Sequence, residues 1–493
     1  MSFLHNDEPI LFGGPSAWRL VSEIGHAVAD CAPPQVFGIH GNWGVGKTSF
    51  LHGLHWYLTG NCPQQPDHEV KAAKAELEEA RLASPDLSLD EPGITFQKAV
   101  TVVWFEAWRY QHEEVPIVPL LHEMRAHLSW TAKARRKAAN LGSTAVRSAL
   151  LALEDITKMI GIQASKIQEA GEQWERENLA VKLPSHVARE QLEAAVGALL
   201  GRHQGKPRRL VILVDDLDRC EPEMAYRFLE GIKIYLNLPS CVFVLGMNQQ
   251  IIEEAIAPHL SFVKPGEDGK AKPAHRHKAH EYIEKICQNI WHLPLVARPH
   301  EMLRDLLEKA GEEAEIIDPL CAVVQHYGCL PPIPRRIKAF ANLIGRRRGH
   351  LKQVHATAQQ EPIATSLPSS VEPWAAITIA FAYLYTYHQV LYRILRDQKR
   401  FFYSQLLSWC ENPAEPPTPE GEKATGSRDD PPEVLRGLQP THERLVVDPS
   451  APTPRLDWQP CIADPAAFNL FRIQRLLFEI GDLDEAVIEA LLD

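Results

Sequence analysis

The sequence has few cysteines and no net positive charge. Its first residues also lack a basic segment followed by an apolar one. Nine cysteines in 493 residues, an odd number with no C-x-x-C pair, exclude a disulfide scaffold and indicate free thiols in a reducing compartment. The first ten residues, MSFLHNDEPI, hold no basic region followed by an apolar core, so we expect no secretory signal. These absences predict a cytoplasmic protein.

The charge balance is acidic, with 63 acidic against 52 basic side chains and a formal net charge of −11. Such a chain binds polyanions poorly over its whole surface, although a local patch can still do so. Two basic runs, Arg135–Lys137 and Arg346–Arg348 with Lys352, could contact nucleic acid or form solvated helix faces. Nucleic acid is therefore a possible partner that the sequence does not specifically indicate.

One uncharged stretch, Pro373 to Tyr392, is long enough to span a bilayer. It also contains Thr378, Thr386, His388, Gln389 and four tyrosines, whose polar groups an isolated spanning helix would leave unpaired in lipid. We therefore expect a buried core helix here rather than a membrane span.

Short apolar runs alternate with helical patterns in the first 295 residues. The runs that predict strands are Val36–Ile39, Val100–Phe105, Arg209–Val214 and Cys241–Leu245. Continuous apolar strands of this kind are buried on both faces of a parallel sheet, so the fold class is α/β with helices on both faces.

The sequence divides into a core with helical insertions and a helical C-terminal part. We expect the core over residues 1–295, with insertions at about 61–91 and 118–204, and a helical subdomain over 296–410 without further strands. Residues 411–460 hold 11 prolines and predict an extended linker. Residues 461–493 predict an amphipathic helical segment that either covers the main domain or binds a partner.

The strongest motif is GNWGVGKT, residues 41–48, which satisfies G-x-x-x-x-G-K-[ST] between an expected strand and an expected helix. Glycines let the backbone curl so that successive N–H groups point at phosphate oxygens. Lys47 would reach the β- and γ-phosphates, and the Thr48 hydroxyl would ligate Mg²⁺. The expected nucleotide-binding residues are Gly41, Asn42, Trp43, Gly44, Val45, Gly46, Lys47, Thr48 and Ser49.

A second motif supplies carboxylates, because the apolar run RLVILV leads directly into Asp215 and Asp216. Asp215 is the expected Mg²⁺ partner, and Asp216 is placed to polarise the attacking water. A second acid favours the hydrolytic branch of P-loop proteins, in which an additional strand lies between the two motif strands, and Val100–Phe105 is our prediction for that strand. No N-K-x-D guanine-reading motif occurs, so ATP is preferred over GTP.

Two weaker polar features remain open. Asn248 follows the strand Cys241–Leu245, where its side chain could sense the γ-phosphate or cap the next helix. His275, His277 and His280 could bind a metal, but a polar loop before a helix is the favoured interpretation.

These residues carry a family resemblance. The chain resembles the KAP family of P-loop NTPases in GNWGVGKTSF, in VWFEAWRYQHEE (Val103–Glu114), in VDDLDRCEPE (Val214–Glu223), in EYIEKICQNIWHLPL (Glu281–Leu295) and in IPRRIKAFANLI (Ile333–Ile344). The resemblance implies an ATP-binding switch or hydrolase, often in defence against phage or in signalling assemblies. Many relatives carry transmembrane helices between the first and third of these pieces, whereas residues 118–204 here are interrupted by charges throughout, so a membrane partner is not expected.

The resemblance also implies roles for residues that spacing alone does not assign. Asp218 and Arg219 extend the acidic strand end, and Arg219 could contact a neighbouring subunit's nucleotide. Arg335 and Arg336 begin a helix where the family's second sensor arginine would lie, and we favour these two, acting in cis. Trp108 and Arg109 belong to the family's aromatic motif. For each arginine a surface salt bridge is an equally acceptable interpretation. The position of Asn248 usually holds aspartate in the family.

The sequence as a whole predicts an ATPase whose cofactors are ATP and Mg²⁺ and whose nucleotide state controls assembly or an effector, and the family resemblance implies a role in anti-phage defence. No second catalytic domain is recognisable, so the output is expected to pass through protein partners encoded nearby or through a homo-oligomer. The alternatives are a nucleotide-binding scaffold that hydrolyses slowly or not at all, and a DNA-associated motor.

Overall fold

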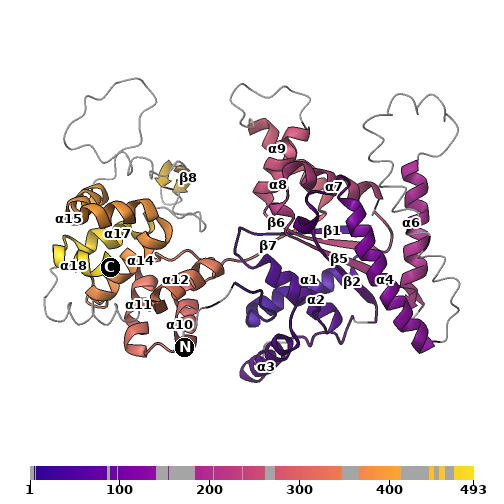
Figure 1. Ribbon diagram of the computed structural model, residues 1–493, viewed down its shortest axis with the longest axis horizontal. Coiled ribbons are helices and arrows are strands. Elements are labelled where there is room, and N and C mark those ends of the chain that lie inside the picture. The colour runs from indigo at the N-terminus through magenta and orange to yellow at the C-terminus, as the bar shows by residue number, and fades with distance from the viewer. Residues whose placement is uncertain are drawn as a thin grey trace. The chain divides into compact units, whose positions relative to one another are not determined.

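The computed structural model forms two compact units, which we describe separately (Figure 1). The sheet unit is Glu8–Leu293, and the helical unit is Met1–Asp7 with Pro294–Asp493. The structure describes residues 5, 7–85, 89–96, 98–139, 151, 154, 184–203, 205–235, 237–260, 273–346, 366–411, 443–448, 455–460 and 471–492.

The sheet unit is built on five parallel strands in the order β2-β5-β6-β1-β7. Their bounds are β1 Gln35–His40, β2 Val100–Glu106, β5 Arg209–Asp215, β6 Cys241–Met247 and β7 Asn289–His292. The four apolar runs identified in the sequence all form strands of this sheet, and the parallel α/β class is confirmed. Because all five strands run the same way, their carboxyl ends meet at one edge, where open α/β sheets bind ligands.

The strand between the two motif strands is not the one predicted. β6 lies between β1, which leads into the glycine loop, and β5, which carries the acids, whereas β2 pairs with β5 at the edge of the sheet. The prediction that Val100–Phe105 is the inserted strand was therefore wrong. The sheet still has the additional-strand arrangement, because Cys241–Met247 occupies that position.

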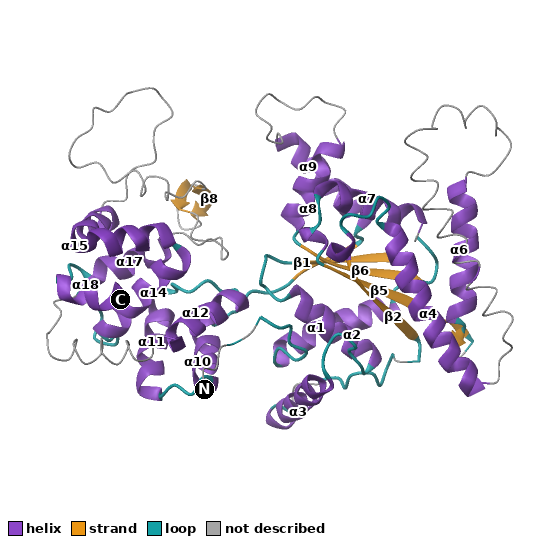
Figure 2. Ribbon diagram, in the orientation of Figure 1, coloured by secondary structure: helices purple, strands orange, loops and turns teal. Residues whose placement is uncertain are grey.

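Alternating residues of each strand face two separate hydrophobic clusters. On β5, Val211 and Leu213 pack with α1 and α2, whereas Leu210, Ile212 and Val214 pack with helices of the opposite face. The first face holds α1 Pro15–Asp30, α2 Lys47–Thr59 and α3 Asp67–Ala83; the second holds α4 Ile117–Ala139, α6 Pro184–Leu200, α7 Pro222–Tyr235, α8 Gln249–Ile256 and α9 Pro273–Ile286 (Figure 2). By this alternation Asp215 falls on the same face as α2.

Both predicted insertions contain helices. α3 lies within residues 61–91 and is mostly exposed, with Ala73 and Leu77 buried against the core. α4 begins at Ile117, one residue before the insertion predicted at 118–204, and α6 lies within it; most of the chain between them is outside the described residues. His275, His277 and His280 lie on α9 rather than in a loop before a helix, so that part of the sequence interpretation was wrong.

Short connections complete the unit: η1 Ala107–Tyr110, η2 Leu217–Arg219, η3 Ala257–Leu260 and the antiparallel pair β3 Arg202–His203 and β4 Lys206–Pro207. η1 follows β2 and η2 follows β5, so both lie at the carboxyl edge of the sheet.

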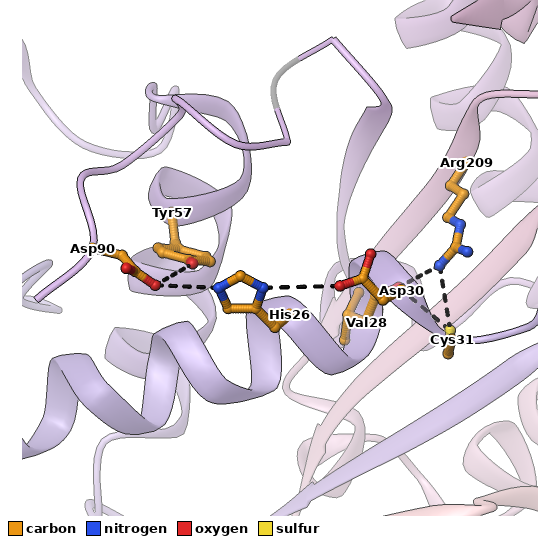
Figure 3. Close-up of polar contacts among 7 residues, drawn as sticks. All are labelled: His26, Val28, Asp30, Cys31, Tyr57, Asp90 and Arg209. Carbon is orange, nitrogen blue, oxygen red and sulfur yellow. Dashed lines mark hydrogen bonds and ion pairs between the residues drawn. The ribbon is translucent and has the colours of Figure 1, made fainter. Parts of the chain in front are cut away.

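Asp90 fixes the segment after α3 to the first two helices (Figure 3). Its Oδ2 accepts a hydrogen bond from the Tyr57 hydroxyl at 2.9 Å and lies 3.2 Å from His26 Nε2, while its backbone carbonyl accepts from Trp18 Nε1 at 2.9 Å. Burial, followed by the hydrogen bond to Asp90, raises the pKa of Tyr57. At the other end of α1, Arg209 Nη1 donates to the Val28 carbonyl at 3.4 Å and ties β5 to this helix.

The same segment approaches α2 closely at two glycines. Gly60 ends α2 with φ 74°, and Gly93, with φ 79°, donates its N–H to the Tyr57 carbonyl at 2.8 Å. A Cβ on Gly93 would lie 2.5 Å from the Gly60 Cα, so neither the backbone conformation nor the space admits a side chain.

Gly93→Ala is therefore expected to lower the free energy of unfolding by about 2–3 kcal/mol, combining a left-handed φ with a backbone clash. Gly197→Ala is the matched control, because Gly197 lies in α6 with nothing within 4 Å of the added Cβ. It should leave stability unchanged or raise it by up to about 1 kcal/mol. Urea denaturation of both variants makes the comparison, and equal stabilities would refute the close approach.

The helical unit has its own core. Its helices are α10 Pro299–Lys309, α11 Ala314–Tyr327, α12 Pro334–Arg346, α14 Pro373–Tyr387, α15 Gln389–Glu411, α17 Phe471–Ile480 and α18 Glu485–Leu492. One cluster of buried side chains runs through all seven, from Leu303 to Leu492. The C-terminal helices thus pack inside this unit, and Ile473, Leu477 and Ile480 are fully buried.

The uncharged stretch Pro373–Tyr392 forms parts of two helices, because α14 ends at Tyr387 and α15 begins at Gln389. Every residue from Trp374 to Leu384 is buried in the core, as predicted, and the Thr378 hydroxyl donates to the Trp374 carbonyl at 2.7 Å. None of the helices in the described ranges is both long enough and apolar enough to cross a bilayer.

Two of the described strands lie outside the sheet unit, beyond the helical region 296–410. β8 Glu443–Asp448 pairs antiparallel with β9 Arg455–Pro460, within the segment predicted to be an extended linker.

Candidate nucleotide-binding site

The glycine loop connects β1 to α2 in a conformation that depends on its glycines. Gly44 and Gly46 have φ of 84° and 104°, in the left-handed region that favours glycine. The loop is held to the sheet by the Gly41 N–H, which donates to the Met247 carbonyl at 3.3 Å, and is closed on itself by Val45 N–H donating to Asn42 O at 3.2 Å. At its far end, the Ser49 hydroxyl accepts the Ile10 N–H at 3.1 Å.

Lys47 begins α2 and is buried at the carboxyl edge of the sheet. Its Nζ donates to the Gly41 carbonyl at 3.0 Å and lies 3.1 Å from Asp218 Oδ2. His40, which precedes the loop, adds no positive charge, because burial, followed by the charges of His292 and Lys47, lowers its pKa to about 4. Lys47 is therefore the cation that the loop itself offers to phosphate.

Asp215 and Thr48 face each other across the same edge. Asp215 is almost fully buried, and a hydrogen bond joins its carboxylate to Thr48. Burial first, and the neighbouring Asp216 second, raise the pKa of Asp215 to about 7. Its Oδ1 accepts no hydrogen bond from the residues that the structure describes. A buried carboxylate with one unused oxygen beside a threonine hydroxyl has the donor set that Mg²⁺ prefers.

The space in front of this carboxylate is kept open by a glycine on the next strand. A Cβ at Gly246 of β6 would lie 3.3 Å from Asp215 Oδ1 and 2.8 Å from Leu51 Cδ1. The residues present thus fit a divalent cation at Asp215 and Thr48.

Asp216 adopts a left-handed conformation, with φ 58°, and its side chain forms an ion pair with Arg219 of η2. The Arg219 Nε lies 2.9 Å from Asp216 Oδ1, and the guanidinium lies over the Trp43 ring at 5.9 Å from its centroid. Burial raises the pKa of Asp216, whereas the nearby Arg219 opposes the shift. Trp43, at the tip of the loop, is 64% exposed.

Asn248 follows β6, and the structure shows one of the two roles that the sequence left open, the helix cap, while contact with the γ-phosphate stays a prediction. Its Oδ1 accepts the Gln250 N–H at 3.0 Å and caps α8, so the capping role is realised. Its Nδ2 donates to Asn42 Oδ1 in the glycine loop at 3.4 Å, which places the side chain beside the expected phosphates.

The remaining sequence candidates divide between the units. Arg219 lies in the sheet unit beside the glycine loop, whereas Arg335 and Arg336 begin α12 of the helical unit, where Arg335 Nε pairs with Asp7 at 2.6 Å. Contact of Arg335 or Arg336 with nucleotide therefore stays a prediction. Arg109 of η1 pairs with Glu106 at the end of β2, and Trp108 beside it is 48% exposed.

Two acids have contacts at the site that were not predicted from the sequence, which placed Asp218 only as an extension of the acidic strand end and assigned no role to Glu106. Asp218 forms an ion pair with Lys47. Glu106 ends β2 in register with Asp215, and its negative charge adds to the effect of burial in raising the pKa of Asp216. The D-D-L-D run shows in the sequence that a third acid follows β5, but it does not show that this acid pairs with Lys47, which lies far away in the chain.

A glycine loop between a strand and a helix, a lysine at the helix start and a buried acid at the end of a non-adjacent parallel strand define a P-loop NTPase of the additional-strand type. The chain belongs to the KAP family, since the sequence model of the KAP family P-loop domain matches residues 20–315, more than half of the chain. Comparison with curated proteins gives no match.

Proposed function

We propose that this protein binds and hydrolyses Mg-ATP and that its nucleotide state controls assembly or a protein partner. The observation that carries the proposal is the convergence of Lys47, Thr48, Asp215 and Asp216 at one edge of the sheet, from elements far apart in the sequence. ATP is preferred over GTP because the sequence contains no N-K-x-D guanine-reading motif.

Each residue has a distinct task in this proposal. The loop N–H groups and Lys47 bind the phosphates, while Thr48 and Asp215 hold Mg²⁺, which when bound neutralises phosphate charge. Asp216 accepts a proton from the attacking water once its carboxylate is free of Arg219. Asn248 adds a polar contact beside the loop.

The switch role is supported by the family membership and by the lack of a recognisable second catalytic domain in the sequence. The helical unit is the candidate output element, acting through a partner encoded nearby or through a second copy of the chain. A role in anti-phage defence rests on the family resemblance, and the net charge of −11 argues against DNA as the main partner.

Lys47→Ala tests the binding site directly. Removal of the loop's ammonium is expected to weaken Mg-ATP binding at least about tenfold, the scale of a charge-assisted contact to phosphate. Isothermal titration of the parent and the variant measures the change. Lys285→Ala is the control, because this residue lies at the end of α9, which leads into the amino end of β7, whereas the loop follows the carboxyl end of the parallel strand β1. Parental affinity in Lys47→Ala would place nucleotide elsewhere.

One observation favours the alternative of a nucleotide-binding scaffold with little hydrolysis. Asp216 is held by Arg219 in this structure, so the expected general base is not free. Single-turnover hydrolysis of radiolabelled ATP at excess protein separates the two functions, because a scaffold would bind ATP and release it intact.

A further inference from the structure

Asp218 and Lys47 form an ion pair that is almost closed to solvent. The Nζ–Oδ2 distance is 3.1 Å, and the two side chains are 8% and 7% exposed. The pair is held from both ends, since Lys47 Nζ also donates to the Gly41 carbonyl and Asp218 Oδ2 also accepts the Asn248 N–H at 3.0 Å. A buried pair of this kind interacts far more strongly than one at the surface.

The three acids of the D-D-L-D run have three different partners. Asp215 faces Thr48, and its Oδ1 accepts no hydrogen bond within the described part of the chain, whereas Asp216 pairs with Arg219. Asp218 alone of the three forms an ion pair with the lysine that phosphate requires. Its position thus matches neither the metal site nor the water-activating site.

Phosphate and Asp218 carry the same sign of charge and need the same ammonium. Nucleotide binding must therefore weaken the Lys47–Asp218 pair, and any phosphate that reaches Lys47 comes close to the Asp218 carboxylate. Repulsion between like charges in a site of low dielectric is costly, and it grows with the charge on the phosphate chain.

We propose that Asp218 is an internal competitor for phosphate, which holds Lys47 in the nucleotide-free state and lowers the affinity of the site for ATP more than for ADP. The larger effect on ATP follows because the γ-phosphate adds charge next to Lys47. This inference rests on the proposed nucleotide site and adds to it a residue that sets its affinity and its ATP-to-ADP preference.

Asp218→Asn removes the charge while keeping an oxygen that can accept the Asn248 N–H. We expect it to tighten binding of a non-hydrolysable Mg-ATP analogue about tenfold and of Mg-ADP by a smaller factor, within the usual range of coupling between ligands. Glu223→Gln is the charge-matched control, because Glu223 at the start of α7 pairs with Arg227 and His259 rather than Lys47. Unchanged or weaker binding of the ATP analogue in Asp218→Asn would overturn the proposal.

The ion pair has a second readout that needs no nucleotide. Lys47→Met and Asp218→Asn should each lower the melting temperature of the nucleotide-free protein, and the double variant should lose less than the sum of the two, because each single change leaves a buried charge alone. Additive losses would refute the pair. Asp218→Ser provides the same comparison if Asp218→Asn does not fold.

The two failures can be told apart. Parental binding in Lys47→Ala would reject the nucleotide site itself. Weakened binding in Lys47→Ala together with parental binding in Asp218→Asn would reject only the role of Asp218 as competitor.

Discussion

Asp216→Asn is expected to leave Mg-ATP bound and to slow hydrolysis by about 10²-fold or more, the usual scale for loss of a general base. Asparagine has nearly the same shape as aspartate but cannot accept a proton from water. Titration of a non-hydrolysable analogue measures binding, and single-turnover phosphate release measures the chemical step.

Asp215→Asn is the companion variant, because the two neighbouring acids have different surroundings. Asp215 is buried against Thr48 and its Oδ1 has no hydrogen-bond partner among the residues described, whereas Asp216 is half-buried, has a left-handed backbone and pairs with Arg219. Asp215→Asn should weaken binding only when Mg²⁺ is present. If both variants changed binding and rate equally, this division of roles would be wrong.

The parallel sheet and its helical layers could be predicted from the sequence because four of the five strands are continuous apolar runs; β7, with the sequence NIWH and no fully buried residue, was not predicted. Val211 and Leu213 face one helical layer and Ile212 and Val214 the other, so no polar face interrupts β5. The buried helix α14 was predicted for a different reason, because polar groups such as Thr378 would lack partners in lipid but find them inside the protein.

The order of the strands in the sheet could not be predicted from these apolar runs. The strand that follows the glycine loop in the chain, β2, lies at the edge of the sheet, while the later strand β6 lies beside β1. Strand order depends on how the crossover helices pack, which apolar periodicity does not encode. Assigning the inserted position by order in the chain therefore led to the wrong strand.

The Lys47–Asp218 contact was hidden for a related reason. The two residues are 171 positions apart (218 − 47 = 171), and the D-D-L-D pattern alone suits a metal site as well as an ion pair. Strand alternation directs Asp215 toward α2, whereas the left-handed Asp216 and the turn η2 bring Asp216 to Arg219 and Asp218 to Lys47.

An arginine at the γ-phosphate is the remaining requirement of the proposed reaction. Charge on the transferring phosphoryl group needs a cation beyond Lys47, and His40 is neutral near pH 7 because its pKa is about 4. The sequence favoured Arg335 and Arg336, but Arg219 is now the stronger candidate, because it lies in the same unit as the glycine loop and over Trp43 of that loop.

Arg219→Ala is accordingly expected to slow hydrolysis by about 10³-fold, the lower end of the range for a lost phosphate-binding arginine. Movement of its guanidinium from Asp216 to the γ-phosphate would also free the general base, so one residue would link substrate binding to activation of water. Arg219→Lys should recover only part of the rate, because an ammonium lacks the planar fork.

Turnover measured at several protein concentrations distinguishes the possible sources of the arginine. If Arg219 acts within its own chain, the parental rate per molecule is independent of concentration; if it acts on a neighbouring subunit, the rate rises as subunits assemble. Arg335→Ala and Arg336→Ala, measured in the same series, should retain most of the parental rate. If either of these variants lost activity while Arg219→Ala kept the parental rate, the sensor arginine would belong to the helical unit. If all three variants kept the parental rate, Lys47 and Mg²⁺ would be the cations that stabilise the transferring phosphate.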